Sequence, residues 1–243
     1  MNSTDPPVVS FVVPAHNEQD LLPRCLSAIR DAGQRGGEPF EIVVVNDAST
    51  DITPELARSD GARVVDVSLR RISAVRNAGA SAARGRWLIF VDADTFVTRA
   101  VIRAALAALR RGEAGGGCAV RFDGGLPLWA RVVAPVFTFV YRAVGLAAGC
   151  FSYCSREAFD RTGGFDGTMY AGEELRMSLA LRRAGRFRVL AEHVITSGRK
   201  LRTHSLGEIF SVLRLAIGGP AAMQDGTRPE FGLWYGPRRR EPR

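Results

Sequence analysis

The first hundred residues alternate short apolar runs with segments of helical periodicity. Each run is nearly continuous and ends at polar or turn-forming residues, whereas the segments between the runs place apolar residues on one helical face. Near-continuous apolar strands that alternate with helices are typical of a mostly parallel sheet covered on both faces. We therefore predict an α/β fold. The predicted strands are 8–13, 41–45, 62–66 and 86–91, and the predicted helices are 18–32, a short helix from Thr53, and 72–83.

The second half of the chain is less regular and predicts shorter, more scattered elements. A glycine cluster at 115–117 separates a helix from a strand, and residues 163–167 form a turn-rich loop. Beyond Gly218 the chain is rich in Gly, Pro and Arg, so we expect 221–243 to be a basic, loosely ordered tail. The predicted helices are 99–111, 128–144, 173–184 and 205–217, and the predicted strands are 118–122, 149–154, 187–190 and 193–196.

The composition is that of a globular protein, with 46% of the 243 residues hydrophobic and 24% charged. The net charge is +8 and Lys200 is the only lysine, so arginine carries almost all of the positive charge. Arginine suits phosphate groups, although we prefer a compositional bias of the genome as the explanation for most of these residues. We expect no nucleic-acid partner, because no basic stripe interleaved with aromatic residues occurs.

The cysteines form no CxxC pair, and with only three histidines they give no zinc pattern. We expect them to be free thiols in a reducing, cytoplasmic compartment. Residues 1–7 lack the layout of a signal peptide. The longest apolar stretch, 132–141, is too short to span a bilayer. It fits a buried or amphipathic helix, and the second interpretation is an interfacial membrane helix.

Two carboxylates, Asp92 and Asp94, follow the apolar run 86–91 with one residue between them. Side chains alternate along a strand, so both can project to the same side. Carboxylate oxygens suit Mg²⁺ or Mn²⁺, which commonly bridge to substrate phosphates. Ligands of open α/β sheets bind at the carboxyl ends of the strands. The alternative is an aspartate that caps the following helix.

Several common nucleotide and hydrolase sites are excluded. The loop after the first strand, residues 14–18, has no glycine and therefore no GxGxxG fingerprint. Lys200 lies between Arg199 and Leu201, so there is no P-loop, and no GxSxG elbow occurs. The kind of nucleotide site that is not excluded is one in which strand-end side chains and a metal hold the nucleotide.

Five motifs, in order and at the expected spacing, resemble the family 2 glycosyltransferases of the GT-A fold. The resemblance covers about residues 8–200 and implies a Rossmann-like α/β/α sandwich with a mostly parallel central sheet. The motifs are Ser10–Glu18 (SFVVPAHNE), Val45–Asp51 (VNDASTD), Ala74–Gly79 (AVRNAG), Asp92-Ala93-Asp94, and Gly163–Asp166 (GGFD) followed by Gly172–Leu175 (GEEL).

The resemblance implies roles for matching residues on the donor side. Pro14, Ala15 and Glu18 would line the nucleoside pocket. Asp47 would accept a hydrogen bond from uracil or guanine, and an Asx-type turn at this position is a compatible alternative. Arg76 would approach the diphosphate, the alternative being a solvated helix arginine.

The metal is expected to be Mg²⁺ or Mn²⁺. The resemblance makes Asp94 its ligand, while Asp92 would contact the ribose or support the metal. A divalent cation stabilises the charge that develops on a departing diphosphate.

The resemblance gives the role of base to the pair Glu173-Glu174. Family members usually have Glu-Asp here, with the second residue as the base, so we prefer Glu174 over Glu173. Consecutive helix residues diverge by about 100°, so only one of the two is expected to face the sugar. The alternative for both is favourable charge at a helix N-terminus.

The segment 193–200 is a further candidate. Arg199 and Lys200 would neutralise the leaving diphosphate. His193 is either a metal ligand or, as we prefer, a histidine on an edge strand. The QxxRW motif of longer members is absent, which argues against a processive synthase.

We therefore expect an inverting, metal-dependent transferase that moves a sugar from a UDP- or GDP-sugar to an acceptor hydroxyl. The acceptor is unknown: a saccharide, a small molecule or a lipid-linked compound. A nucleotidyltransferase and a non-catalytic sugar-nucleotide binder are the alternatives. The expected location is cytoplasmic, with a peripheral contact to the inner face of the membrane left open. The expected organisation is one domain, 1–220, with a nucleotide-binding half (8–95), an acceptor-binding half (96–200) and a C-terminal helix (201–220).

Overall fold

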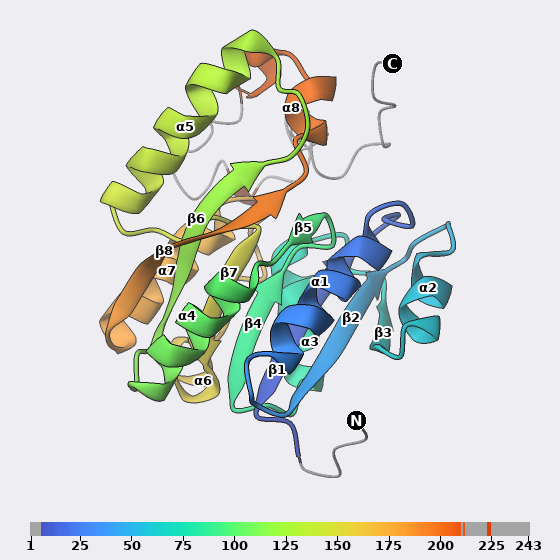
Figure 1. The fold of residues 1–243 in the computed structure, drawn as a ribbon, viewed down its shortest axis with the longest axis vertical. Coiled ribbons are helices and arrows are strands. Elements are labelled where there is room, and N and C mark those ends of the chain that lie inside the picture. Colours follow the sequence, from blue (N-terminus) through green and yellow to red (C-terminus); the bar gives the residue numbers. More distant parts are fainter. Residues whose placement is uncertain (1–5, 210, 212–222, 225–243) are drawn as a thin grey trace.

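The computed structural model describes residues 6–209, 211, 223 and 224. Eight strands form one sheet in the order β3-β2-β1-β4-β7-β6-β8-β5, shown in Figure 1. Both predicted halves contribute to this sheet, since β1 to β4 come from the first and β5 to β8 from the second. The strands are β1 (Val9–Ala15), β2 (Phe40–Asp47), β3 (Arg63–Val67), β4 (Trp87–Val91), β5 (Thr95–Phe96), β6 (Gly115–Phe122), β7 (Phe151–Ser155) and β8 (Phe187–Thr196).

Helices cover both faces of the sheet, as predicted. One apolar core joins one face of the sheet to α1, α2 and α4, and a second joins the other face to α3, α6 and α7. Helix α5 lies at the top of Figure 1, beyond the end of β6, with α8 beside it. The helices are α1 (Leu22–Gln34), α2 (Thr53–Ser59), α3 (Ile72–Ala82), α4 (Arg99–Arg110), α5 (Leu128–Ala143), α6 (Arg156–Thr162), α7 (Glu173–Ala184) and α8 (Arg199–Thr203).

The parallel half of the sheet aligns the strand ends that carry the sequence motifs. Strand β1 pairs in parallel with β2 and β4, and β2 pairs in parallel with β3. In this register Ala15 is opposite Asn46, and Asp47 is opposite Val67. The polar residues after β1, β2 and β4 therefore meet at one edge of the sheet.

Strand β7 is antiparallel to both of its neighbours, β4 and β6, and joins the two halves. It runs antiparallel to β4, with Val91 opposite Phe151. The backbone N–H of Asp92 consequently donates to the carbonyl oxygen of Cys150 at 3.1 Å. This pairing holds the segment before β7 against the aspartates that follow β4.

Three differences from the predicted elements have local physical reasons. Helix α1 begins at Leu22 rather than at residue 18, because Asn17 has a left-handed φ of 52° and Pro23 occupies the first turn. The strands predicted at 187–190 and 193–196 are one strand, β8, with a register shift opposite Cys118/Ala119. Helix α8 was not predicted, because its five residues are too few for a periodic signal.

Helix α6 was missed altogether. It has seven residues, and it begins where the Ser155 hydroxyl accepts from the N–H of Ala158 at 3.1 Å. It ends at Gly163, whose φ of 77° is the left-handed conformation that glycine adopts readily. Seven residues are too few to show a repeating apolar pattern, so the two caps were the available signal.

The predicted helix 205–217 lies partly outside the described residues. Of its described residues, 206–209 and 211 are helical. The predicted tail, 221–243, is also outside them except for residues 223 and 224. Among the described residues, no helix combines the length and apolarity needed to cross a membrane.

Replacement of Gly79 by alanine should destabilise the protein. Gly79 packs α3 against the sheet, and an added Cβ would lie 2.3 Å from Val12 Cγ1 and 2.7 Å from Val45 Cγ2. Overpacking of this kind costs about 1–3 kcal/mol. Urea unfolding should show the loss, whereas Gly167→Ala, where an added Cβ meets nothing, should leave the midpoint nearly unchanged. Equal midpoints for the two variants would contradict this account of the packing.

Candidate functional site

A cavity of about 410 Å³ opens at the sheet edge where the strand-end motifs meet. Both halves of the chain line it, which places residues far apart in sequence around one space. Of the predicted site residues, Arg199 lies outside the lining, as does the further candidate His193. The predicted residues that line the cavity are Pro14, Ala15, Glu18, Asp47, Arg76, Asp92, Asp94, Glu173, Glu174 and Lys200.

Asp47 ties the end of β2 to the loop after β3. Its carboxylate accepts from the backbone N–H of Leu69 at 2.7 Å and of Arg70 at 2.9 Å. The predicted Asx-type turn belongs to the neighbouring Asn46, whose side-chain oxygen accepts from the N–H of Ser49 at 3.2 Å. Asp47 thus has a structural task, and it still faces the cavity beside Pro14 and Ala15.

His16 and Arg70 were not predicted as site residues, yet both line this end of the cavity. The ring Nδ1 of His16 lies 2.7 Å from the carbonyl oxygen of Asp47, and Nη1 of Arg70 lies 2.8 Å from His16 Nε2. His16 was within the first motif and could have been noticed there. Arg70 belongs to none of the sequence motifs. Only the fold of its loop brings it to the cavity.

Arg76 is a buried hub rather than a solvated helix arginine. Its side chain is 3% exposed. One terminal nitrogen donates to Glu173 Oε1 at 2.5 Å, and the other to Asp92 Oδ1 at 2.8 Å and to the carbonyl oxygen of Gly149 at 2.6 Å. The guanidinium therefore joins the aspartate after β4 to the first turn of α7. The arginine predicted to approach a diphosphate is engaged with two carboxylates.

Asp92 and Asp94 lie in the turn between β4 and β5, and both reach the cavity. Neither caps the following helix, because the Thr98 hydroxyl accepts from the N–H of Val101 and caps α4. Burial raises the pKa of Asp94 to about 6; Lys200 and Arg199 oppose this shift, whereas Glu18 and Asp92 add to it. The capping interpretation is thus wrong, and the turn gathers negative charge in the cavity.

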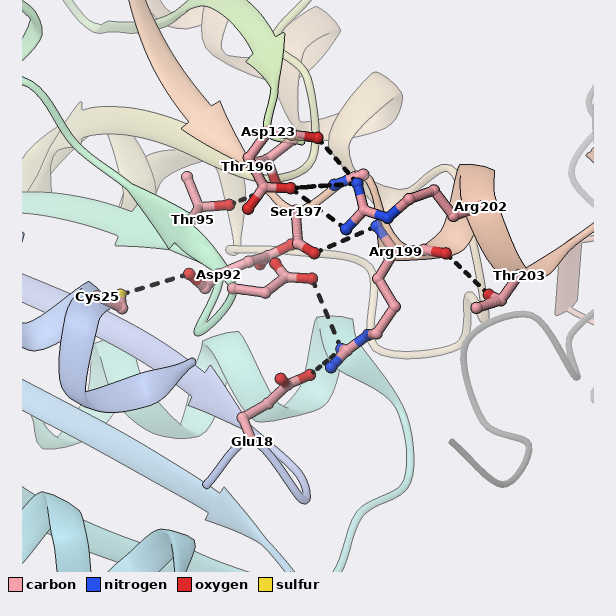
Figure 2. A network of polar contacts seen from close by, with 12 residues as sticks. Glu18, Cys25, Asp92, Thr95, Asp123, Thr196, Ser197, Arg199, Arg202 and Thr203 are labelled. Atoms are coloured by element: carbon pink, nitrogen blue, oxygen red, sulfur yellow. Dashed lines mark hydrogen bonds and ion pairs between the residues drawn. The ribbon is translucent and has the colours of Figure 1, made fainter. Parts of the chain in front are cut away.

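Arg199 reaches across the site from α8 toward Glu18, as Figure 2 shows. Its Nη2 lies 2.8 Å from Glu18 Oε1 and 3.9 Å from Asp94 Oδ2. The guanidinium thereby supplies positive charge where the carboxylates of Glu18, after β1, and Asp94, after β4, converge. Its neighbour Lys200 also lines the cavity.

The two glutamates that begin α7 have different environments, although both line the cavity. Glu173 is held by Arg76. Burial and the nearby charge of Glu173 raise the pKa of Glu174 to about 8. The Glu174 side chain lies against Gly149, where an added Cβ would be 3.5 Å from its Cδ, an ordinary van der Waals contact. Glu174 is thus the carboxyl group of the pair that is not fastened to Arg76.

His193 is not part of the cavity lining. Its backbone carbonyl accepts from the Thr98 hydroxyl at 3.0 Å, and it pairs with Ala119 inside the sheet. The interpretation as an edge-strand histidine fits this position, because β5 pairs only with Ile195 and Thr196, so that among the described strands β8 borders β6 alone at His193. The four cysteines are free thiols, as predicted, and burial raises the pKa of the Cys118 thiol to about 12.

Part of the cavity lining is apolar and was not predicted. It comes from β6, α5 and α8 and from the segments that follow these two helices. The sequence held no motif for this wall, because its residues are ordinary apolar side chains on separate elements. They include Val120, Phe122, Tyr141, Leu146, Leu201 and Ile209.

Residues 10–164 match the family described as "Glycosyl transferase family 2". The succinoglycan biosynthesis protein ExoO of Rhizobium meliloti is 40% identical over 99 residues, which cover 37% of this chain and 26% of that protein. The undecaprenyl-phosphate 4-deoxy-4-formamido-L-arabinose transferase of Aeromonas hydrophila is 36% identical over 101 residues, covering 39% and 31%. The matched segments thus span less than a third of these two relatives.

Solved structures share the fold at low sequence identity. The mannosyltransferase PcManGT of Pyrobaculum calidifontis, in complex with GDP-Man and Mn²⁺, has a TM-score of 0.66 at 20% identity over 96% of this chain and 70% of that one. Glucosyl-3-phosphoglycerate synthase of Mycobacterium tuberculosis, in complex with Mn²⁺, UDP and glucosyl-3-phosphoglycerate, has a TM-score of 0.59 at 21% identity, covering 87% and 77%. The predicted GT-A fold is confirmed by these likenesses.

The family match covers more than half of the chain and includes the first four motifs, up to Asp92 and Asp94. It therefore confirms the resemblance that the motifs predicted. These findings agree with the strand-end cavity, and the chain belongs to glycosyl transferase family 2.

Proposed function

We propose that this protein transfers a sugar from a nucleoside diphosphate sugar to an acceptor hydroxyl, with inversion at the anomeric carbon. The observation that carries the proposal is one cavity that holds two separate sets of carboxylates. Asp92 and Asp94 come from the turn after β4, and Glu174 comes from the first turn of α7. A donor diphosphate and an acceptor hydroxyl need different groups, and the cavity offers one set for each.

The donor side fits a divalent cation held jointly by protein and substrate. Asp94 and Asp92 supply carboxylate oxygens, and the raised pKa of Asp94 reflects burial and crowding of negative charge that a cation would relieve. Among the described residues, no group of three or more His, Cys, Asp or Glu side chains is arranged to hold a metal by itself. Phosphate oxygens of the donor would complete the ligand set, as is usual for Mg²⁺ and is suitable for Mn²⁺. Bound there, the cation would stabilise charge on the leaving diphosphate.

The remaining donor contacts follow from the position of each side chain. Pro14, Ala15 and Asp47 would hold the nucleoside at the ends of β1 and β2. Lys200 and Arg199 would add positive charge near the diphosphate. Arg76 would act indirectly, by fixing the Asp92 carboxylate in place.

The acceptor side needs a group that takes a proton from the attacking hydroxyl. We assign this to Glu174, because Glu173 already binds Arg76. A carboxylate whose pKa lies near 8 is a stronger base than an ordinary glutamate, which favours proton transfer. A single displacement by the hydroxyl breaks the bond to the diphosphate and inverts the anomeric carbon.

Binding of a nucleotide sugar together with Mn²⁺ should raise the thermal midpoint of the wild-type protein. Ligand at about 100 times its Kd adds about 2.7 kcal/mol, which corresponds to about 5–10 °C for a chain of this size. A thermal-shift screen of UDP- and GDP-sugars, with and without Mn²⁺, measures this directly. Asp94→Asn should lose the Mn²⁺-dependent part, whereas Asp160→Asn, on the exposed surface of α6, should keep it.

Product analysis separates the proposed function from the two alternatives. A glycosyltransferase releases a nucleoside diphosphate, and a nucleotidyltransferase releases pyrophosphate. Donor binding without turnover on any acceptor would favour a sugar-nucleotide binder. The proposal fails if no UDP- or GDP-sugar shifts the midpoint, or if pyrophosphate is the product.

A further inference from the structure

Helix α5 presents a continuous apolar stripe to solvent. The stripe, here called the α5 stripe, follows helical spacing and comprises Leu128, Val132, Val136, Phe139, Val140 and the C-cap residue Val144. Val132 and Phe139 are 68% and 73% exposed. In the described part of the chain, the other large exposed apolar side chains are Ile52, Leu69 and Leu179, scattered over other elements. A contiguous exposed stripe of this kind marks a surface that binds something.

The charges around the α5 stripe are all of one sign. Arg131 and Arg142 are exposed on α5, and the helix contains no acidic residue. An apolar helix face bordered by arginines and free of carboxylates is the pattern of a helix that lies in the surface of an anionic membrane. A docking site for a basic or neutral protein would have no need of this charge.

The opposite side of the same helix lines the cavity. Thr138, Tyr141 and Arg142 contribute to the cavity wall. Burial raises the pKa of the Tyr141 hydroxyl, and the charges of Glu174 and Glu173 add to the shift, so this tyrosine lies within their electrostatic reach. Helix α5 therefore separates the α5 stripe from the carboxylates by the thickness of one helix.

Apolar side chains line the cavity next to α5. Leu146, whose backbone N–H donates to the carbonyl oxygen of Tyr141 at 3.0 Å, lines the cavity just beyond the end of α5. Phe122, Leu201 and Ile209 add apolar surface to the lining that a nucleotide, a diphosphate or a sugar does not require. Helix α5 therefore carries the α5 stripe on one side and borders a partly apolar cavity on the other, which favours lipid over a protein partner.

We propose that the α5 stripe binds the surface of an anionic lipid bilayer and thereby brings the partly apolar cavity on the other side of α5 next to that surface. The stripe inserts among the lipid headgroups with α5 in the membrane plane, and Arg131 contacts anionic headgroups. This inference deepens the proposed function by naming the surface at which the cavity works. The vesicle assay below contains no donor and no acceptor, so the two proposals can fail separately.

The test is flotation of the full chain with two kinds of vesicle: phosphatidylcholine mixed with phosphatidylglycerol, and phosphatidylcholine alone. Wild-type protein should float with the anionic vesicles and much less with the neutral ones. The double variant Val132→Glu, Phe139→Glu should lower the partition coefficient by about tenfold or more, because both exposed side chains lose their apolar contact. Its matched control is the double variant Ile52→Glu, Leu179→Glu, which adds the same two charges at exposed apolar positions before α2 and on α7 and should bind as wild type does.

A second pair of variants tests the charge. Arg131→Gln should weaken binding to the anionic vesicles by about fivefold, the contribution of one arginine near such a surface. Arg103→Gln removes the same charge from an exposed position on α4 and should have little effect. High salt should also weaken binding of the wild-type protein to the anionic vesicles, because salt screens the attraction to the headgroups.

The thermal unfolding midpoint of each variant, measured without donor, checks that the fold is intact. The proposal is overturned if wild-type protein floats with neither vesicle, or if the Val132→Glu, Phe139→Glu variant floats as well as wild type. It is also overturned if light scattering shows a dimer that this variant dissociates while vesicle binding is absent, since a second copy would then cover the stripe. Loss of flotation in the variant, with the controls unchanged, supports it.

Discussion

Glu174→Gln should lower kcat by about a hundred- to ten-thousand-fold, the usual contribution of a general base. The amide keeps the size of the side chain and cannot accept the proton from the acceptor hydroxyl. The variant should nevertheless be as stable as wild type or more so. In the wild type a raised pKa means that burial and the Glu173 charge disfavour the ionised form, and glutamine removes that penalty.

Steady-state transfer assays and urea unfolding of the same preparations measure the two effects together. Glu157→Gln is the control, because that glutamate is in the first turn of α6 with an 82% exposed side chain. It should keep full activity. Unchanged kcat in Glu174→Gln on the true substrate pair would remove Glu174 from the mechanism and direct attention to Glu173.

The same carboxyl group sets the expected pH dependence. The base must be ionised, so kcat/KM should rise with pH and level off above about 8, the raised pKa of Glu174. Stability should change in the opposite direction. Between the ordinary pKa of a glutamate and about 8, the folded state binds more protons at this group than the unfolded state does, so its contribution to stability falls as pH rises. Glu174→Gln should abolish both dependences, and a pH–rate profile that persists in this variant would assign them to another group.

Arg76→Met should destabilise the fold by about 3–5 kcal/mol, the cost of breaking a buried ion pair by removing one partner. Arg76 is 3% exposed and binds Asp92 and Glu173, so its loss leaves their carboxylates facing the same space without a counter-charge. Donor binding should weaken as well, because Asp92 loses the contact that orients it. The loss of stability should be smaller at low pH, where carboxylates left without a partner can take up a proton.

Chemical denaturation at two pH values measures this, and a second substitution shows its cause. Glu173→Gln added to Arg76→Met should recover part of the lost stability, because one buried charge is removed. Arg161→Met is the control: its ion pair with Glu157 is exposed on both sides, and such pairs contribute about 0–1 kcal/mol. If Arg76→Met and Arg161→Met were equally stable, Arg76 would not be the hub described above.

The sequence by itself determined the alternation of strands and helices and the position of most site residues. Both depend on local information. Apolar periodicity is a property of neighbouring residues, and parallel strands that begin together bring their carboxyl ends to one edge. Asp47, Asp92 and Asp94 follow strand ends directly, so their meeting at the cavity could be predicted without coordinates. The family motifs added Glu173 and Glu174, which their own spacing would not have identified.

Only the tertiary structure decided which of these residues contact one another. Arg76 meets Glu173 across 97 positions of sequence, and Arg199 meets Glu18 across 181. Contacts over such separations depend on how α7 and α8 pack against the sheet, and no local pattern encodes that packing. The threonine directly before the predicted helix 99–111 was a sequence signal for a cap, but the structure was needed to show that the Thr98 hydroxyl, and neither Asp92 nor Asp94, accepts the helix N–H. The apolarity of α5 was plain in the sequence, but whether its stripe faces the core or solvent depends on which surfaces the rest of the fold leaves to cover it.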